Sequence, residues 1–222
     1  MLTVWGRISS INVRKVVLAA QWLGLDFKRT DAGSQFGIVK SPAYLAMNPN
    51  ALVPVVDDGG FVLWESNVIV RYLCAKYAPA LPMSRGSAPA EGALPASLYP
   101  SDLRARFNAE RWMDWQQTTL NPAGRNAFIQ WVRTLPEQRD AALIAKSVAA
   151  MQPLLAMLDS HLSQHAFVGG DALSMADIPL VCEIHRWWGL PQPRAYFPHI
   201  ERWYQGLLAM PGSRGVLDQP LS

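Results

Sequence analysis

The residues between Val53 and Asn67 include groups that could hold both ends of a small, peptide-like acid. Glu65 can accept hydrogen bonds from an ammonium group, while Ser66 and the amides at a helix start can donate to a carboxylate. Pro54 lacks a backbone N–H and opens an expected strand, which places it at an exposed edge. This combination predicts a binding site for a small peptide-like acid.

A hairpin followed by a helix must position these groups. Two short apolar runs, residues 50–56 and 61–64, flank the sequence Asp-Asp-Gly-Gly, a pattern typical of a β-hairpin. The short polar residues at 65–67 then mark the start of a helix that continues with the apolar run 68–72.

The chain upstream predicts a strand, a helix and a second strand. Residues 2–5 form the first strand, and Gly24 ends the helix before the second strand at 26–30. The helix has apolar residues spaced as one buried face: Val13, Val16, Val17 and Ala20. Strand, helix and strand, followed by a hairpin and a helix, is the element order of a thioredoxin-like domain.

The second half of the chain predicts helices only. Prolines and glycines fill residues 81–101, which we interpret as a linker with a surface insertion. A long helix is expected at 102–131. Ser174 and Asp177 have the spacing of a capping box that opens a buried central helix. The prediction is an α/β thioredoxin-like domain at 1–80, the linker, and an all-α domain at 102–222.

Val53-Pro54 and Glu65-Ser66, separated by a hairpin, resemble the glutathione-binding half of the cytosolic glutathione S-transferases. The capping box resembles the one that opens the central helix of their helical domain, so the resemblance covers nearly the whole chain. It implies a cis proline at Pro54 and pairing of the Val53 backbone with the cysteinyl unit of glutathione. It also implies that Glu65, Ser66 and Asn67 bind the γ-glutamyl end.

The resemblance also implies where the sulfur is activated. Ser10-Ile11-Asn12-Val13-Arg14 is similar to the Ser-type motif of theta and delta-like members, in which a hydroxyl donates to the glutathione sulfur. Ser10 is the expected catalytic residue, with Asn12 as a second donor. A free thiol has a pKa near ~8.5, and lowering it by one unit requires ~1.4 kcal/mol of preferential thiolate stabilisation. Ser9 as the donor, and Ser10 as a plain helix N-cap, stay open.

Two parts of the expected site have weaker sequence support. Ala51 and Leu52 stand where relatives often have a His, Gly or Lys beside the glycine end of glutathione, so Lys40 is the candidate there. A solvated surface lysine is the alternative. Three aromatic residues could line an apolar pocket for the second substrate, although aromatics at helical spacing also fit a core: Phe36, Trp112 and Trp115.

Composition limits the other function classes. The 222 residues are 50% hydrophobic and 17% charged with a net charge of +3, and their scattered Lys and Arg do not suggest a nucleic-acid site. We expect no membrane span and no signal peptide. Cys74 and Cys182 fit reduced core thiols, which favours the cytoplasm. His161 and His165 have the spacing of a metal pair but no third ligand, so no metal is expected.

The sequence therefore predicts a glutathione S-transferase of the detoxification type. It would activate its co-substrate glutathione as a thiolate for attack on a small, apolar electrophile, by conjugation, dehalogenation or ether cleavage. The alternative is a non-catalytic family member that acts as a carrier or an assembly module. The apolar helix expected at 67–77 predicts a homodimer.

Overall fold

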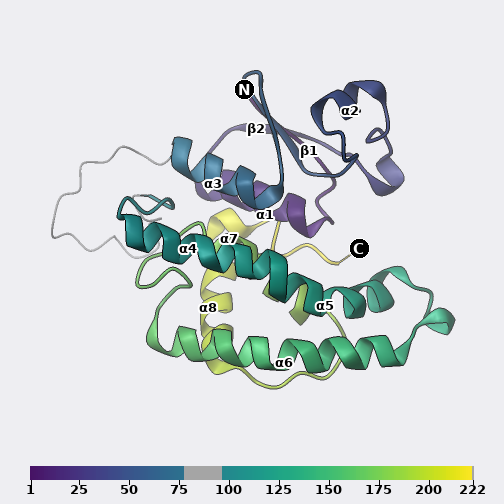
Figure 1. Cartoon of the computed structure of the whole chain (residues 1–222), viewed down its shortest axis with the longest axis vertical. Coiled ribbons are helices and arrows are strands. Elements are labelled where there is room, and N and C mark those ends of the chain that lie inside the picture. Colours follow the sequence, from purple (N-terminus) through teal and green to yellow (C-terminus); the bar gives the residue numbers. More distant parts are fainter. Residues whose placement is uncertain (78–96, 222) are drawn as a thin grey trace.

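The structure is a computed structural model that describes residues 1–77 and 97–221. In the N-terminal part the elements are β1 (Leu2–Trp5), α1 (Ile11–Trp22), β2 (Phe27–Thr30), η1 (Ser34–Phe36), α2 (Pro42–Met47), β3 (Val55–Asp58), β4 (Phe61–Trp64) and α3 (Ser66–Tyr77). The strand order is β2-β1-β3-β4, with β1 and β2 parallel and the other two pairs antiparallel. This mixed sheet with its helices confirms the predicted thioredoxin-like domain (Figure 1).

In the described residues of the C-terminal part, all of the regular elements are helices. Its elements are α4 (Leu103–Trp115), η2 (Gln116–Leu120), α5 (Asn121–Phe128), η3 (Ile129–Arg133), η4 (Pro136–Gln138), α6 (Ala141–Gln164), α7 (Asp177–Trp188), α8 (Pro198–Leu208) and η5 (Pro211–Ser213). Two of these, η2 and η3, are π-helical turns, and they join α4 and α5 into one helical run from residue 103 to 133. The predicted all-α domain is confirmed.

The predicted linker and insertion lie mostly outside the described residues. Of the predicted range 81–101, only 97–101 is described, and there Leu98 is buried in the helical core. Its carbonyl accepts a hydrogen bond of 2.8 Å from the Met175 N–H. The boundaries at residues 80 and 102 stay a prediction.

The first hairpin strand begins at Val55, next to Pro54, where we expected it to open. Residues 50–54 form a loop, and β3 starts at Val55. The side chain of Asn48 holds this loop, because its amide donates to the Leu52 carbonyl at 2.9 Å and its oxygen accepts from the Asn50 N–H at 3.0 Å. These side-chain bonds compete with the β-ladder for the backbone groups.

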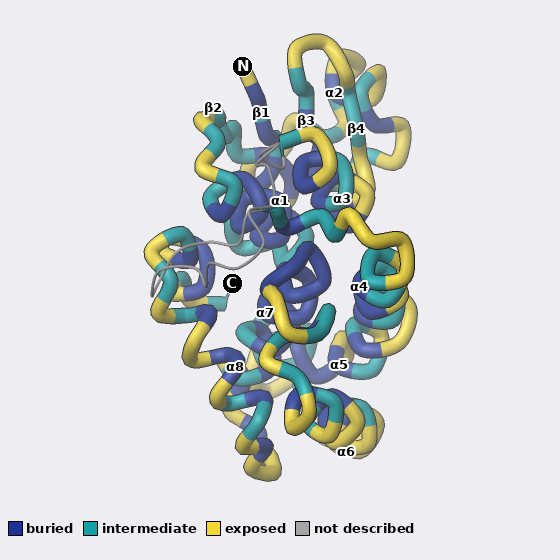
Figure 2. Tube along the Cα trace, turned by 90° about the vertical axis from the view of Figure 1, so that its left-hand side faces the viewer, coloured by how far each residue is buried: buried dark blue, intermediate teal, exposed yellow. Residues whose placement is uncertain are grey.

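The two domains share a continuous core around α1 and α7. Figure 2 shows both helices buried along most of their length, and α1 packs against α3 on one side and α7 on the other. Ten of the twelve residues of α7 are buried, which confirms it as the central helix of the second domain. The N-terminus of α1 therefore lies at the junction of the two domains.

Length and composition alone would allow α6 to cross a membrane. Its most apolar 18-residue window has a mean hydropathy of 1.6, and 22% of that window is buried. Ala and Leu on the outer side of α6 add to its buried seam and raise this mean hydropathy, and the absence of a membrane span stays a prediction. That seam packs toward α5 and α8 and contains Met151, Leu155, Leu158 and Leu162.

The predicted capping box forms at the start of α7. The Ser174 N–H donates to the Asp177 carboxylate at 2.9 Å, and the Ala176 N–H donates to the Ser174 hydroxyl at 3.3 Å. Asp177 also accepts from the Trp203 indole at 2.8 Å and the Val168 N–H at 2.9 Å. Burial raises the pKa of Asp177 to about 6, opposed by these hydrogen bonds.

Replacing Ser174 by Ala should destabilise the fold without weakening the site at the domain junction. Loss of an N-cap side chain costs ~1 kcal/mol, and here the Asp177 carboxylate also loses a buried neighbour. Urea unfolding measures the loss, and calorimetric titration with glutathione serves as the control. An unchanged unfolding midpoint would contradict this prediction.

Candidate active site

Two loops meet at the N-terminus of α1. The Val53–Pro54 peptide bond is cis, as the resemblance implies. Gly6, between β1 and α1, has φ +150°, and a Cβ there would lie 2.4 Å from Val13 Cγ2 and 3.2 Å from Val53 Cβ. Only glycine fits this close approach. It brings the start of α1 and the Val53 loop to the same cavity, of about 420 Å³.

Ser10 occupies the N-cap position of α1 without acting as a cap through its side chain. Its backbone is extended, with φ −78° and ψ 124°, and its hydroxyl makes no capping hydrogen bond. Ser9 and Ser10 both line the cavity. The hydroxyl of Ser10 is therefore available to a ligand at the positive end of the helix dipole.

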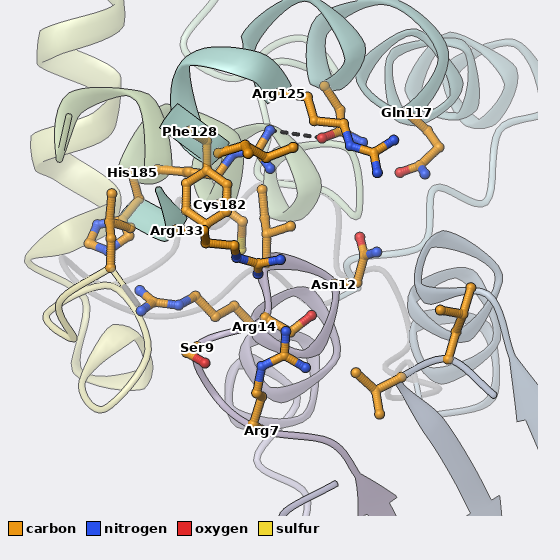
Figure 3. A pocket seen from close by; sticks show the side chains of 18 residues that line it. Arg7, Ser9, Asn12, Arg14, Gln117, Arg125, Phe128, Arg133, Cys182 and His185 are labelled. Atoms are coloured by element: carbon orange, nitrogen blue, oxygen red, sulfur yellow. Dashed lines mark hydrogen bonds between the residues drawn. The ribbon is translucent and has the colours of Figure 1, made fainter. Parts of the chain in front are cut away.

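Asn12 connects this position to the expected γ-glutamyl site. Its Oδ1 accepts a hydrogen bond of 3.2 Å from the Ser66 hydroxyl. The same side chain lines the cavity, so its Nδ2 hydrogens remain for a ligand (Figure 3). Ser66 is only 4% exposed and begins α3, where the first backbone amides have no intrahelical acceptor.

Glu65 and Asn67 flank Ser66 in different environments. Glu65 is exposed and has φ +72°, a left-handed conformation that costs a non-glycine residue ~1–3 kcal/mol and often marks functional sites. Asn67 is buried, and its amide donates to the Met113 carbonyl of α4 at 2.8 Å. The geometry thus turns the Asn67 amide toward the second domain.

Other predicted residues lie away from this cavity. Lys40 is exposed on the turn before α2, and Phe36 in η1 is 43% exposed. Trp112 and Trp115 line a separate cavity of about 560 Å³ beside α6. There their rings pack edge to face with centroids 5.2 Å apart, and Trp112 also contacts His161 at 4.7 Å. The structure does not bring these three aromatics together at Ser10, because the two tryptophans pack on α6.

The far wall of the cavity comes instead from later turns of the long helix. Its lining residues recur every fourth position: Gln117, Asn121, Arg125, Ile129 and Arg133. Phe128 lies beside them, and Arg7 approaches from the loop after β1 (Figure 3). Sequence reasoning missed these residues, although the four-residue spacing was visible. The lining is basic and mixes polar with apolar side chains, and the apolar electrophile that we expected stays a prediction.

A buried polar network lies behind this wall and joins the domains. Lys15 of α1 donates to the side-chain oxygens of Gln116 at 2.8 Å and Gln117 at 3.1 Å. Gln116 donates in turn to Glu183 at 2.8 Å, and Glu183 pairs with Arg186. Lys15, Gln116 and Glu183 are fully buried. Burial lowers the pKa of Lys15 to about 8, partly offset by Glu183.

Two further groups at the cavity are not available for chemistry. Burial raises the pKa of the Cys182 thiol to about 12, which keeps it protonated. His185 uses both ring nitrogens, one 3.0 Å from the Tyr204 hydroxyl and one 3.1 Å from the Gln219 carbonyl. Burial lowers its pKa, so the ring is neutral at pH 7. Ser9, Ser10 and Asn12 remain the candidates at the helix start.

The described residues contain no group of three His, Cys, Asp or Glu side chains arranged to hold a metal ion. His161, one half of the possible metal pair, has its Nε2 2.9 Å from the Val168 carbonyl. Its ring also stacks on His165 with centroids 4.6 Å apart. This pair is part of the packing between α6 and its neighbours.

Comparisons with known proteins agree with this geometry. Residues 1–75 match the family described as glutathione S-transferase, N-terminal domain, and residues 120–211 match the corresponding C-terminal domain. The chain is 37% identical to glutathione S-transferase GstB of Escherichia coli strain K12, over 100% of both chains.

A solved crystal structure is also similar to this chain over its full length. The theta class glutathione S-transferase of Xanthomonas axonopodis pv. citri, with glutathione bound, is 38% identical to this chain with a TM-score of 0.89. The match covers 100% of this chain and 99% of that one. These relatives are named as transferases, which favours the enzyme over the non-catalytic carrier or assembly module. The chain therefore belongs to the glutathione S-transferase family and is a glutathione transferase.

Proposed function

We propose that Ser10 donates a hydrogen bond to the sulfur of bound glutathione and stabilises its thiolate, with Asn12 as a second donor. The observation that carries this proposal is the Ser10 hydroxyl, which sits at the N-terminus of α1 and is not used as a cap. A hydrogen bond to a charged acceptor contributes ~1.5–3 kcal/mol, enough to lower a thiol pKa by one to two units. The thiolate then attacks an electrophilic carbon.

We propose that glutathione lies beside the Val53–Pro54 loop, which precedes the internal strand β3, and extends toward the start of α3. Pairing of the Val53 backbone with the cysteinyl unit is supported by the position of Val53, which lines the same cavity as Ser10. Glu65 would accept from the ammonium group. The Ser66 amide would donate to the γ-glutamyl carboxylate, and the Ser66 hydroxyl would donate to it in place of the Asn12 Oδ1. Lys40 remains the candidate for the glycine carboxylate. Asn67 would contribute its backbone amide, because its side chain is bonded to Met113.

Replacing Ser66 by Ala should weaken glutathione binding more than it slows turnover. Ser66 would contact the γ-glutamyl end equally in the ground state and the transition state. Loss of a hydrogen bond to a carboxylate should raise the KM for glutathione about tenfold. Steady-state kinetics with saturating electrophile measure both constants. An unchanged KM with a lower kcat would contradict the assignment of Ser66.

We also propose that the enzyme is a homodimer. Five large apolar side chains on β4, α3 and α4 are more than one third exposed: Phe61, Trp64, Val68, Leu103 and Phe107. The α3 and α4 helices are neighbours, because Arg71 of α3 pairs with Asp114 of α4. An apolar area spread over adjacent elements is typical of a subunit interface. A monomer mass in light scattering at micromolar concentration would exclude the dimer.

The broader role in detoxification and the cytoplasmic location stay predictions. Cys74 and Cys182 are both free and buried, as expected for reduced core thiols. Fractionation of the native cells, with a marker enzyme for each compartment, would test the location.

A further inference from the structure

The cavity beside Ser10 carries a positive charge that the proposed glutathione site does not use. Five arginines line it, and its lining includes no Asp or Glu. Two of the five guanidinium groups are bonded to other groups of the protein. Arg14 donates to four backbone carbonyls, including Val216 at 2.8 Å, and Arg186 pairs with Glu183.

The other three guanidinium groups have no such partners. Among the residues that the structure describes, Arg7, Arg125 and Arg133 make no side-chain hydrogen bond and no ion pair with a carboxylate. Figure 3 shows Arg7 reaching up from the N-terminal domain and Arg133 reaching toward it from the opposite helix. Arg133 is exposed, and partial desolvation lowers its pKa, with a further lowering by repulsion from Arg7, Arg186 and Arg125. Their mutual repulsion favours an anion between them.

The position of these arginines relative to Ser10 indicates which substrate they contact. Glu65 and Ser66 do not line the cavity, which begins at Ser10, Asn12 and Val53 and extends along the opposite helix. Glutathione held at Glu65 and Ser66 would present its sulfur at the near end. The arginines would then lie beyond the sulfur, on the side from which an electrophile approaches.

Phe128 is buried and packs against two arginines of this basic region. Its ring lies 5.0 Å from the Arg133 guanidinium carbon and 5.2 Å from that of Arg186. Both guanidinium groups are thereby held over an aromatic face, a geometry suited to a planar ligand that carries a carboxylate. Guanidinium groups bind carboxylates through paired hydrogen bonds.

We propose that the second substrate of this transferase is an electrophile that carries a carboxylate, bound by Arg133, Arg125 and Arg7. This inference rests on the proposed function and names the substrate class for the same site. The glutathione thiol loses its proton to solvent, and the thiolate sulfur forms a bond to the electrophilic carbon. With an aryl chloride, the carbon–chlorine bond breaks and chloride leaves with the electron pair.

The test compares two electrophiles of nearly equal shape, 4-chloro-3-nitrobenzoate and its neutral amide, 4-chloro-3-nitrobenzamide. Their enzymatic kcat/KM values are divided by the uncatalysed rates with glutathione, which removes the difference in intrinsic reactivity. The wild type should favour the carboxylate. In Arg133→Gln and Arg125→Gln, kcat/KM for the carboxylate should fall about tenfold, and the fall for the amide should be several times smaller.

Arg104→Gln is the matched control, because Arg104 is exposed on α4 and does not line the cavity. Equal losses with both electrophiles, a rise in the KM for glutathione, or no turnover of the carboxylate would each overturn the inference. Titration of bound glutathione without any electrophile tests the proposed function by itself. If bound glutathione forms its thiolate as proposed but the enzyme prefers the amide, only the carboxylate site is rejected and the proposed function stands.

Discussion

Replacing Glu183 by Gln should lower the free energy of unfolding by about 3–5 kcal/mol, because it leaves two buried cations without their anion. Glu183 is fully buried, pairs with Arg186 and accepts from Gln116, which in turn binds Lys15. Lys15 and Arg186 are 0% and 7% exposed, so water cannot replace the lost charge. Urea unfolding followed by tryptophan fluorescence measures the effect.

Two variants separate lost charge from lost packing. Glu137 has the same chemistry but is exposed in η4, and Glu137→Gln should leave the unfolding midpoint unchanged. Adding Lys15→Met to Glu183→Gln removes one of the uncompensated cations, so the double variant should be more stable than the sum of the single losses. Strict additivity would show that the network does not couple Lys15 to Glu183.

Replacing Ser10 by Ala should lower turnover ten- to hundredfold with little change in glutathione affinity. The hydroxyl would act on a thiolate that forms only on the way to reaction, and a hydrogen bond to a charged acceptor contributes ~1.5–3 kcal/mol. Steady-state kinetics with saturating glutathione give kcat, and calorimetry gives the affinity. Ser9→Ala is the matched control, since Ser9 lines the same cavity.

Stability should not account for this loss. The Ser10 side chain makes no capping hydrogen bond, so Ser10→Ala removes no cap from α1 and should unfold at the wild-type urea concentration. A tenfold loss that came with a lower unfolding midpoint would instead support the plain structural role that the sequence left open.

Local patterns predicted most of the N-terminal domain and the start of α7 in the second domain. The Asp-Asp-Gly-Gly turn, the helix start at Ser66 and the box at Ser174 and Asp177 are short-range signals, and each element forms where expected. The resemblance correctly implied the cis bond before Pro54. The strand β3 was predicted to open at Pro54 and opens at Val55, whereas the side-chain bonds by which Asn48 holds the preceding loop could not be read from the hydrophobic pattern.

The wall of the cavity could not be predicted in the same way. In a regular α-helix a four-residue step turns by about 40° beyond a full circle, so Gln117 and Arg133 would drift to different faces. The π turns at 116–120 and 129–133 contain more residues per turn than an α-helix. They therefore keep the lining residues from Gln117 to Arg133 on one face. The sequence alone does not indicate these π turns, so it predicts the aromatics Trp112 and Trp115 as the lining of the second-substrate pocket.

The long-range network was equally hidden. Lys15 and Glu183 lie on α1 and α7, in different domains, and no local spacing relates them. Each would be expected on a solvated helix face by composition alone. Only the packing of α1 against α7 brings them to opposite ends of the Gln116 side chain.

The most direct test of the account is a pH titration of glutathione bound to the wild type and to Ser10→Ala, Ser9→Ala and Asn12→Ala, followed by the ultraviolet absorbance of the thiolate. The wild type should form the thiolate below the ordinary thiol pKa of ~8.5. Ser10→Ala should raise the midpoint by about one to two units, and Asn12→Ala by less. If Ser10→Ala has the wild-type midpoint while Ser9→Ala or Asn12→Ala has a higher one, the assignment of Ser10 is contradicted.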